Sequence, residues 1–330
     1  MKIIISLDYE LFFGQKIGTP ENCLIRPVTE LLKVLDKYNI KLSLFVDVGY
    51  LLCLKRHFKQ YPALQSEYDT VCNHLKELDQ QGHDIQLHIH PHWEDTIYDG
   101  KNWQFDFSRY RLHDFSSTEI NRIVAEYKQE LEQLTSKPVF AFRAGGWCIQ
   151  PFEQIAGALY EHGIWLDSTA YNNGLSTEPK RWFDFSNMPT DIMWRFDNDL
   201  LIRKENGRFL EVPISAVKVS PLFFWKFLFS KILKQRHHRS YGDGIPLRWT
   251  KSQYLKMLTS FSYSVASIDG KKADLVFPAY RQLKQSQPDG VFNLIGHPKA
   301  LSPYSIKKLQ QFLSEHRFES TTFQDYKNEA

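Results

Sequence analysis

The alternation of short apolar runs with helix-length amphipathic segments is the feature that most constrains the fold of this chain. Ile3 to Leu7 is typical of a buried strand, and Val28 to Tyr38 carries leucines at helical spacing before a second strand at Leu42 to Val46. The same alternation predicts strands at 84–87, 139–142, 164–166 and 292–295, and helices at 67–81, 117–134, 152–162 and 305–316. It indicates βαβ units around a parallel sheet.

The alternation stops after Asp167, where a long segment rich in turns and aromatic residues follows. We expect residues from about 172 to 250 to form an irregular insertion before the last strand, with one further strand at Phe209 to Ser215. A helix is expected at Ser252 to Phe261. Because the insertion is too irregular to suggest an independent unit, we predict that residues 1–330 form a single α/β domain.

Composition narrows the class of protein and its compartment. Lysine and arginine total 41 against 38 acidic residues, a surplus too small to indicate a nucleic-acid partner. No apolar run reaches the roughly 18 residues of a membrane-spanning helix, and the first apolar run meets Asp8 too early for a secretory signal. The four cysteines show no CxxC spacing. We therefore expect a cytoplasmic protein with no nucleic acid among its partners.

Polar and ionisable side chains gather where the predicted strands end, which is the edge where parallel α/β folds build their active sites. Each of these residues alone could cap a turn or serve as an ordinary structural residue. Their combination indicates a functional site. The residues are Asp8 and Glu10, His88, His90 and His92, Arg143, Asp167, and His297.

The segment from Gly82 to His92 is the most informative of these strand ends, because three imidazoles within five residues can place two nitrogens on one divalent ion. If the strand continues through Pro91, all three rings share one face. If the chain turns into a loop after His88, then His88 and His92 converge while His90 faces elsewhere. Proline at position 91 favours the loop.

A carboxylate beside such a histidine pair would complete a hydrolytic metal site with open positions for water and substrate. Strand alternation places Asp8 and Glu10 on the same side of the first strand. One of them can ligate the ion while the other acts as a general base, since a bound cation lowers the pKa of its water toward about 7.

Five motifs in this order resemble those of the polysaccharide deacetylases of the NodB-homology type, also called carbohydrate esterase family 4. That family carries a TFDDG-like strand end, a GHExxNHTxxH segment, an FRxP-like motif, an aspartate motif and a Leu-x-His motif. The resemblance spans most of the chain. The counterparts here are Ser6-Leu-Asp-Tyr-Glu10, Gly82 to His92, Phe142-Arg-Ala-Gly-Gly-Trp147, Trp165-Leu-Asp-Ser-Thr169 and Leu294-Ile-Gly-His-Pro298.

The resemblance implies a distorted (β/α)7, TIM-like barrel that binds Zn²⁺ or another divalent ion and hydrolyses an acetamide or acetyl ester on a sugar. His88 and His92 match the family's two histidine ligands. Where the usual motif has a second aspartate as metal ligand, this chain has Tyr9, and Glu10 stands in place of the glycine. Relatives with an Asp-x-Asp or Asp-x-Glu pattern make Glu10 the expected third ligand.

The catalytic roles implied by the resemblance also map onto single residues. Asp8 matches the general base and Arg143 matches the arginine that orients it. His297 matches the general acid, with Asp167 expected to support it. Attack of an activated water on the acyl carbonyl would then be followed by protonation of the departing amine.

Aromatic residues are the expected substrate contacts. Trp93 opens a polar, aromatic-rich loop that ends near Tyr110, and its rings could stack on sugars or form a small core of their own. Trp147 stands in the arginine motif, where Ala144 replaces the family's usual proline and so changes the sugar pocket. We therefore predict that Trp93 and Trp147 bind substrate.

The segment 221–239 combines Phe, Trp and Leu with a basic cluster and is too short in apolar residues to span a bilayer. A basic amphipathic helix of this kind can lie in a membrane interface, where it would suit a lipid-linked glycan. It could equally pack on the barrel with a solvated lysine edge. The segment therefore leaves open, for a protein expected in the cytoplasm, an association with the membrane surface.

Three functional hypotheses follow from the sequence. The first is a metal-dependent enzyme that deacetylates an N-acetylated sugar, in the synthesis of a bacterial surface polysaccharide or lipopolysaccharide. The second is a catalytically silent barrel that binds a glycan or glycolipid. The third takes His88 and His90 as the HxH pair of an unrelated metal-dependent hydrolase, in which His90 rather than His92 is essential.

Overall fold

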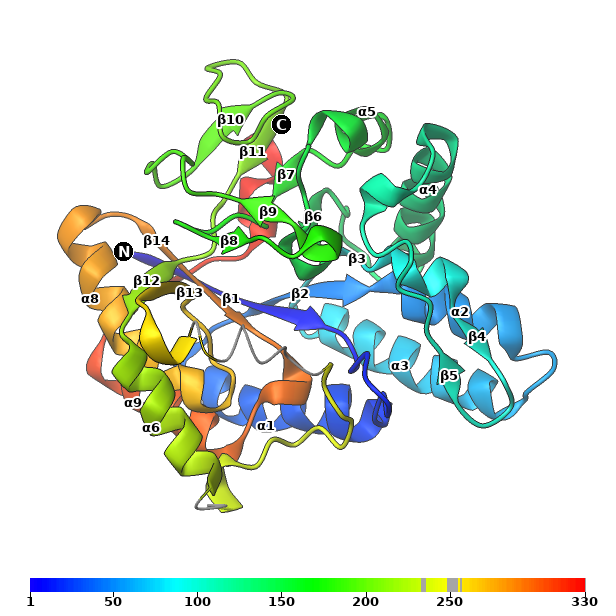
Figure 1. The fold of residues 1–330 in the computed structure, drawn as a ribbon, viewed down its shortest axis with the longest axis horizontal. Helices are drawn as coiled ribbons and strands as arrows, with labels where there is room; N and C mark the ends of the chain where they lie inside the picture. Colours follow the sequence, from blue (N-terminus) through cyan, green and yellow to red (C-terminus); the bar gives the residue numbers. More distant parts are fainter. Residues whose placement is uncertain (233–235, 248–254, 256, 330) are drawn as a thin grey trace. The chain divides into compact units, whose positions relative to one another are not determined.

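The computed structural model describes residues 1–232, 236–247, 255 and 257–329. Contacts divide the chain into two compact units, and Figure 1 draws their elements. Unit 1 comprises Met1–Ile40 and Ile214–Thr321, and unit 2 comprises Lys41–Pro213 and Thr322–Ala330. Strands with parallel partners carry the core of each unit, which confirms the predicted α/β class. The single-domain organisation and the (β/α)7 count stay predictions.

The central strand of unit 1 is β1 (Lys2–Tyr9), which runs parallel to β14 (Val291–Gly296). At its first two residues β1 also pairs in parallel with β15 (Glu319–Ser320). Almost every side chain of β1 is buried, as expected for a parallel strand covered on both faces. The apolar run that begins the sequence is therefore a core strand.

Helices and an antiparallel pair of strands, β12 with β13, complete unit 1. Phe312 of α9 packs against Tyr280 of α8 and Phe292 of β14, with ring centroids 5.3 and 5.7 Å away, so two helices cover one face of β14. The elements are α1 (Arg26–Leu35), β12 (Ala216–Val219), α6 (Pro221–Ile232), β13 (Ser262–Val265), α8 (Val276–Ser286) and α9 (Pro303–Glu315). Short helical turns lie at Glu21–Ile25, Asp36–Tyr38, Arg236–His238, Gly270–Leu275 and Pro298–Ala300.

The sheet of unit 2 has the strand order β2, β3, β6, β7, β11, β10. All neighbours are parallel except β10, which is antiparallel to β11. The register sets Asp47, His88 and Arg143 side by side on three successive strands. The strands are β2 (Leu42–Asp47), β3 (Asp84–Ile89), β6 (Ala141–Ala144), β7 (Leu166–Asp167), β10 (Trp194–Phe196) and β11 (Phe209–Glu211).

The helices of unit 2 follow strands as βαβ units require. Ser116 and Glu119 form a reciprocal capping box that fixes the start of α4. The helices are α2 (Val48–His57), α3 (Ala63–Gln80), α4 (Ser117–Glu132) and α5 (Glu153–Glu161). Two small hairpins pair β4 (Ile97–Tyr98) with β5 (Trp103–Gln104) and β8 (Leu175–Ser176) with β9 (Phe183–Asp184). Helical turns lie at Pro91–Asp95, Leu112–Asp114, Gly145–Trp147, Pro179–Arg181 and Phe323–Glu329.

The predicted insertion is more ordered than its sequence suggests. The strand expected at Phe209 to Ser215 is present as β11, which pairs with β7. A helix begins at Pro221, as the basic amphipathic segment predicts. Of the helix expected at 252–261, residues 255 and 257–259 are helical, while 252–254 and 256 lie outside the described residues. Within the described part of the chain, no helix has the length and apolarity needed to cross a bilayer.

Candidate active site

Two acidic residues stand at the end of β1 in unit 1. Asp8 lies one residue before the end of β1, and Glu10 directly follows the strand. Both side chains are buried. The register pairs Leu7 with Gly296, so Asp8 and His297 come next on adjacent strands. His297 Nε2 lies 3.6 Å from Asp8 Oδ2 and 3.8 Å from Glu10 Oε1, beyond direct hydrogen-bond distance. The structure therefore brings together the predicted base, the predicted acid and a predicted ligand.

Asp269 is the carboxylate that holds His297 in unit 1. Its Oδ2 accepts from the ring Nδ1 of His297 at 2.7 Å, and its Oδ1 accepts the backbone N–H of the same residue at 2.7 Å. Burial alone would lower the pKa of His297, but the charge and hydrogen bond of Asp269, with the β1 carboxylates, raise that pKa above its ordinary value. Burial raises the pKa of Asp269, yet the contacts with His297 outweigh it and leave the pKa low.

Asp167 was predicted for the supporting role that Asp269 has here, and Asp269 itself was missed. Asp269 lies in no recognisable motif. Its position near His297 depends on a β-bridge between Ser267 and Ile295, which the sequence does not predict. That bridge fixes the segment 267–269 beside β14 and sets Asp269 against His297. In the sequence, Asp269 stands directly before Gly-Lys-Lys, where an aspartate usually only caps the start of a helix.

Lys299 is a second residue that sequence reasoning missed. Its Nζ donates to Glu10 Oε1 at 2.8 Å and to the carbonyl of Leu11. The rings of Phe12 and Phe13 lie 5.2 and 4.7 Å from the ammonium group. Both groups are buried, so this pair holds the Glu10 carboxylate in a fixed position.

His88 is the residue of β3 best placed to bind an ion within unit 2. Its ring Nδ1 lies 2.8 Å from the backbone carbonyl of Arg143. A carbonyl only accepts, so Nδ1 carries the proton and Nε2 is the nitrogen that the ring offers as a ligand. A hydrogen bond from the second ring nitrogen to a carbonyl is the usual way in which proteins orient a metal-binding histidine.

His90 lies beside His88 in unit 2. The strand runs to Ile89 and the backbone at His90 is still extended, so the loop expected after His88 begins only with Pro91, which opens a helical turn. The two rings therefore share one face of the strand, with centroids 4.7 Å apart. Gly145 makes room for the second ring, because a Cβ there would lie 2.6 Å from His90 Nδ1.

His92 lies in the helical turn and is enclosed by aromatic rings. Its imidazole stacks on Trp93 at 5.4 Å and on Tyr110 at 6.1 Å, and Phe105 and Phe107 lie 5.6 and 5.1 Å away. The ring of His90 is 5.4 Å distant. One alternative from the sequence had His88 and His92 converging while His90 faced elsewhere. In the structure, His88 and His90 are instead the adjacent pair.

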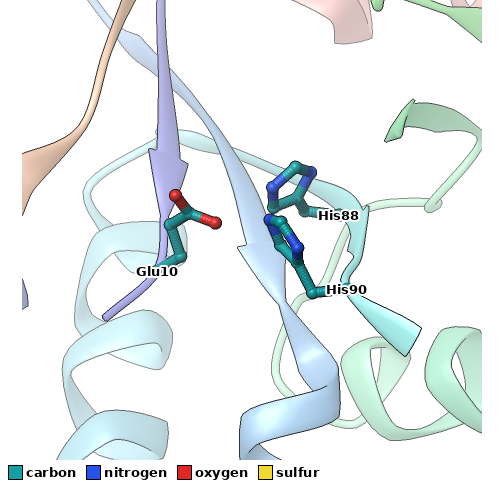
Figure 2. A group of neighbouring side chains, drawn as sticks. All are labelled: Glu10, His88 and His90. Atoms are coloured by element: carbon teal, nitrogen blue, oxygen red, sulfur yellow. The ribbon is translucent and has the colours of Figure 1, made fainter. Parts of the chain in front are cut away.

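Figure 2 draws Glu10, His88 and His90, three buried residues whose side chains each offer one atom as a candidate metal ligand. Glu10 belongs to unit 1, and both histidines belong to unit 2. One carboxylate oxygen and two imidazole nitrogens are the donors typical of catalytic zinc sites. The donor chemistry of these residues therefore fits a divalent ion such as Zn²⁺.

Arg143 is fully buried at the end of β6. Its Nε donates to the carbonyl of Ser168 at 2.7 Å and its Nη2 donates to Ser168 Oγ at 3.1 Å. The guanidinium lies 4.1 Å from the ring centroid of Phe45, a cation–π arrangement. These contacts hold the arginine in one orientation, and its action on Asp8 stays a prediction.

Asp167 and Glu211 form a buried carboxyl pair on adjacent strands of unit 2. Burial raises the pKa of Asp167, although Thr169 stabilises the charged form by donating from its hydroxyl at 2.7 Å. Burial and then the charge of Asp167 raise the pKa of Glu211 well above its ordinary value. Glu211 was missed by the sequence analysis, although it ends the strand at Phe209-Leu-Glu. The two carboxyl groups therefore take up a proton more readily than isolated ones.

Trp93 is fully buried and does not present a face to a sugar. Its Nε1 donates to Asp47 Oδ2 at 2.7 Å, and the rings of Tyr50 and Trp103 lie 5.3 and 5.7 Å away. Phe105 also lies 5.3 Å from its ring, and Trp103 and Phe105 are partly buried while Gln104 and Asp106 are exposed. Of the two alternatives for this aromatic loop, the structure favours the small core, and direct sugar stacking by Trp93 is inconsistent with its position.

Trp147 is partly exposed and has the left-handed backbone conformation, with φ of 61°. For a bulky residue this conformation is strained and needs support from its surroundings. The rings of Tyr171 and Phe183 lie 5.7 and 6.2 Å away. The substrate-binding role of Trp147 stays a prediction.

No family model matches the chain, and no curated protein matches it either. Among solved structures it is similar to a protein from Mycobacterium smegmatis provisionally described as a polysaccharide deacetylase, with 16% identity, a TM-score of 0.43, and coverage of 94% of this chain and 83% of the other. It is also similar to a polysaccharide deacetylase from Bacillus cereus, with 11% identity, a TM-score of 0.40, and coverage of 97% and 92%.

A branching enzyme from Thermococcus kodakaraensis is similar as well, with 10% identity, a TM-score of 0.49, and coverage of 99% of this chain and 71% of the other. All three TM-scores lie below 0.5, and the matched structures differ in activity. The likenesses therefore assign neither a reaction nor a substrate to this chain.

Proposed function

We propose that this protein is a metal-dependent hydrolase that removes an acetyl group from an N-acetylated sugar. The observation that carries the proposal is the arrangement in unit 1, where His297, oriented by Asp269, faces Asp8 across 3.6 Å. Hydrolysis of an amide needs one group that takes a proton from water and another that gives a proton to the departing nitrogen. The five motifs in the order of the polysaccharide deacetylases support the same reaction class.

The donor chemistry supports a divalent ion, most simply Zn²⁺, as cofactor. We assign Glu10 and His88 as ligands, because one is a buried carboxylate and the other presents Nε2 while a carbonyl holds its Nδ1. We assign His92 as the third ligand, because it matches the second histidine ligand of the polysaccharide deacetylases that the sequence resembles. When bound, such an ion supplies Lewis-acid polarisation of the acyl carbonyl and lowers the pKa of water.

The chain's own groups carry the protons. Asp8 takes the proton of the attacking water, and Arg143, fixed by Ser168, orients the Asp8 carboxylate. The raised pKa of His297 favours the protonated imidazolium, whose Nε2 gives its proton to the nitrogen that leaves the acyl group. A bound cation would lower the pKa of His297 again in part, so the Asp269 carboxylate would be needed to keep the imidazolium protonated.

A second candidate is a hydrolase with an HxH ligand pair, and one observation favours it. His88 and His90 are adjacent on one face of β3, whereas the ring of His92 lies inside an aromatic cluster. The two candidates share Asp8 and His297 and differ in which histidine completes the metal site. Substitution of His90 and His92 one at a time separates them.

The substrate is proposed to be an acetylated sugar of a bacterial surface polysaccharide or lipopolysaccharide, bound in part by Trp147. The partial exposure of Trp147 supports this role, because an indole face can stack on a sugar ring. The rings of Tyr171 and Phe183 pack against the indole and would hold it in place during binding.

The test is release of acetate from N-acetylglucosamine and its oligomers by protein stripped with a chelator and then reloaded with Zn²⁺. Asp8→Asn serves as the matched inactive control, since it keeps the size of the side chain. Acetate release by the reloaded wild type and not by the variant supports the proposal. Tight sugar binding with metal bound and no acetate release would favour the silent glycan-binding barrel.

A further inference from the structure

Helix α6 exposes a row of large apolar side chains that the catalytic proposal does not use. Leu222, Trp225 and Phe229 are 60%, 42% and 58% exposed, and their spacing of three and four residues sets them on one face of the helix. Soluble proteins rarely leave several large apolar side chains together in water. This face therefore requires an apolar partner.

The packing of α6 extends this surface within unit 1. Trp225 Nε1 donates to the carbonyl of Leu258 at 3.0 Å, which ties the helix to the segment before β13. Phe261, on the same segment, is 65% exposed, and Lys218 of β12 lies 5.3 Å from its ring centroid. The apolar row and Phe261 thus belong to connected elements, with a lysine beside them.

The sequence that contains this surface is strongly basic. Between Glu211 and Asp269 the sequence has nine lysines and arginines and one acidic residue, Asp243. Asp243 is engaged elsewhere, because its carboxylate accepts from the backbone N–H and the hydroxyl of Thr19. Lys226 and Arg239 are exposed. The chain as a whole has a net charge of only +3, so the basic residues are concentrated in this segment.

We propose that α6 with Phe261 docks the protein on the surface of a bilayer containing anionic phospholipid. Tryptophan and phenylalanine enter the boundary between headgroups and acyl chains, while lysine and arginine stay at the anionic headgroups. The positive charge argues against a second copy of this chain as the partner, because two such surfaces would repel each other. The inference is independent of the proposed reaction.

The experiment is sedimentation of the full chain with vesicles of phosphatidylcholine alone or mixed with phosphatidylglycerol. Wild type should bind the mixed vesicles and lose binding as salt is added. Leu222→Glu with Phe229→Glu should lower binding about tenfold or more, since two apolar side chains become charged. Lys226→Glu with Arg239→Glu should lower binding to anionic vesicles at least about fivefold for each charge.

Matched controls separate the surface from general effects of added charge. Ile97 and Ile202 are 61% and 64% exposed in unit 2, so Ile97→Glu with Ile202→Glu makes the same chemical change away from α6. Lys59→Glu with Lys101→Glu is the control for charge, as both lysines are exposed in unit 2. Both controls should bind like wild type and give the same circular dichroism as the α6 variants.

Two results would overturn the proposal. One is wild type that stays in the supernatant with anionic vesicles, or α6 variants that sediment as well as wild type. The other is a dimer in gel filtration that Leu222→Glu with Phe229→Glu converts to a monomer, without vesicle binding by either protein.

Discussion

Nδ1 of His297 donates a hydrogen bond of 2.7 Å to Asp269, and this bond determines which ring nitrogen faces the carboxylates of β1. The low pKa of Asp269 keeps it ionised, so it acts only as an acceptor and the proton resides on Nδ1. Nε2 is then the nitrogen directed at Asp8 and Glu10. Replacement of Asp269 therefore removes the charge that stabilises the His297 imidazolium without touching a proposed ligand.

Asp269→Asn should lower kcat for acetate release by roughly 10²- to 10³-fold, because a neutral amide no longer stabilises the His297 imidazolium and can donate to Nδ1 of the neutral ring. Metal content should stay the same. Asp274→Asn is the matched control, since Asp274 pairs with Lys271 on the same segment. Equal activity of Asp269→Asn and wild type would show that His297 is not the acid.

The two carboxylates at the end of β1 should have different functions. Asp8→Asn should abolish turnover while metal is retained, because it removes the base and leaves Glu10 in place. Glu10→Ala should weaken metal binding about tenfold or more. Isothermal titration with Zn²⁺ together with acetate release distinguishes these outcomes, and a fully active Asp8→Asn enzyme would refute the assignment of the base.

Gly145→Ala should disturb the candidate metal site through His90. A Cβ at this position would lie 2.6 Å from His90 Nδ1 and 2.6 Å from the carbonyl of Ile89, so the ring or the strand has to shift. We expect a loss of about 1–3 kcal/mol in the free energy of unfolding and weaker Zn²⁺ binding. Gly157→Ala is the matched control, because its Cβ would meet nothing within 4 Å and α5 should gain up to about 1 kcal/mol.

Buried histidines outside the site should make the fold sensitive to acid. His83 is buried and its Nδ1 accepts the N–H of Leu42 at 3.1 Å. Burial, with the charges of Lys41 and Lys137, lowers the pKa of His83 to about 4. The neutral ring therefore stabilises the folded state above the ordinary pKa near 6.5, and this stability is lost as the pH falls through that value toward 4.

The size of the effect can be measured with His83→Asn, whose side-chain oxygen can accept the same N–H but takes up no proton. Urea unfolding at pH 7 and pH 4.5 should show that wild type loses roughly 2 kcal/mol more than the variant. An equal loss in both proteins would mean that His83 is not the source of the acid sensitivity.

Much of the fold could be predicted because apolar periodicity and burial agree in β1, β2, β3 and β14. α2 was missed because β2 passes into it directly at Asp47 and Val48, with no turn residues between them. α8 was missed because its polar residues follow an irregular segment.

The candidate site was predictable where side chains follow strands at a readable spacing, as for Asp8, His88 and His297. Asp269 and Lys299 were not predictable, because their function depends on which loops lie together after folding. The sequence could not decide which two of the three histidines lie side by side. A strand that ends one residue earlier or later would place different rings next to each other.

The central claim is that this chain binds a divalent ion through Glu10, His88 and one further histidine. The most direct measurement is metal content by elemental analysis of untagged protein purified without chelators, for wild type and for separate alanine variants of His88, His90 and His92. We predict one bound ion, lost in His88→Ala and in one of the other two variants, which names the third ligand. Absence of an ion from wild type after reconstitution with Zn²⁺, or full metal content in His88→Ala, would contradict the claim.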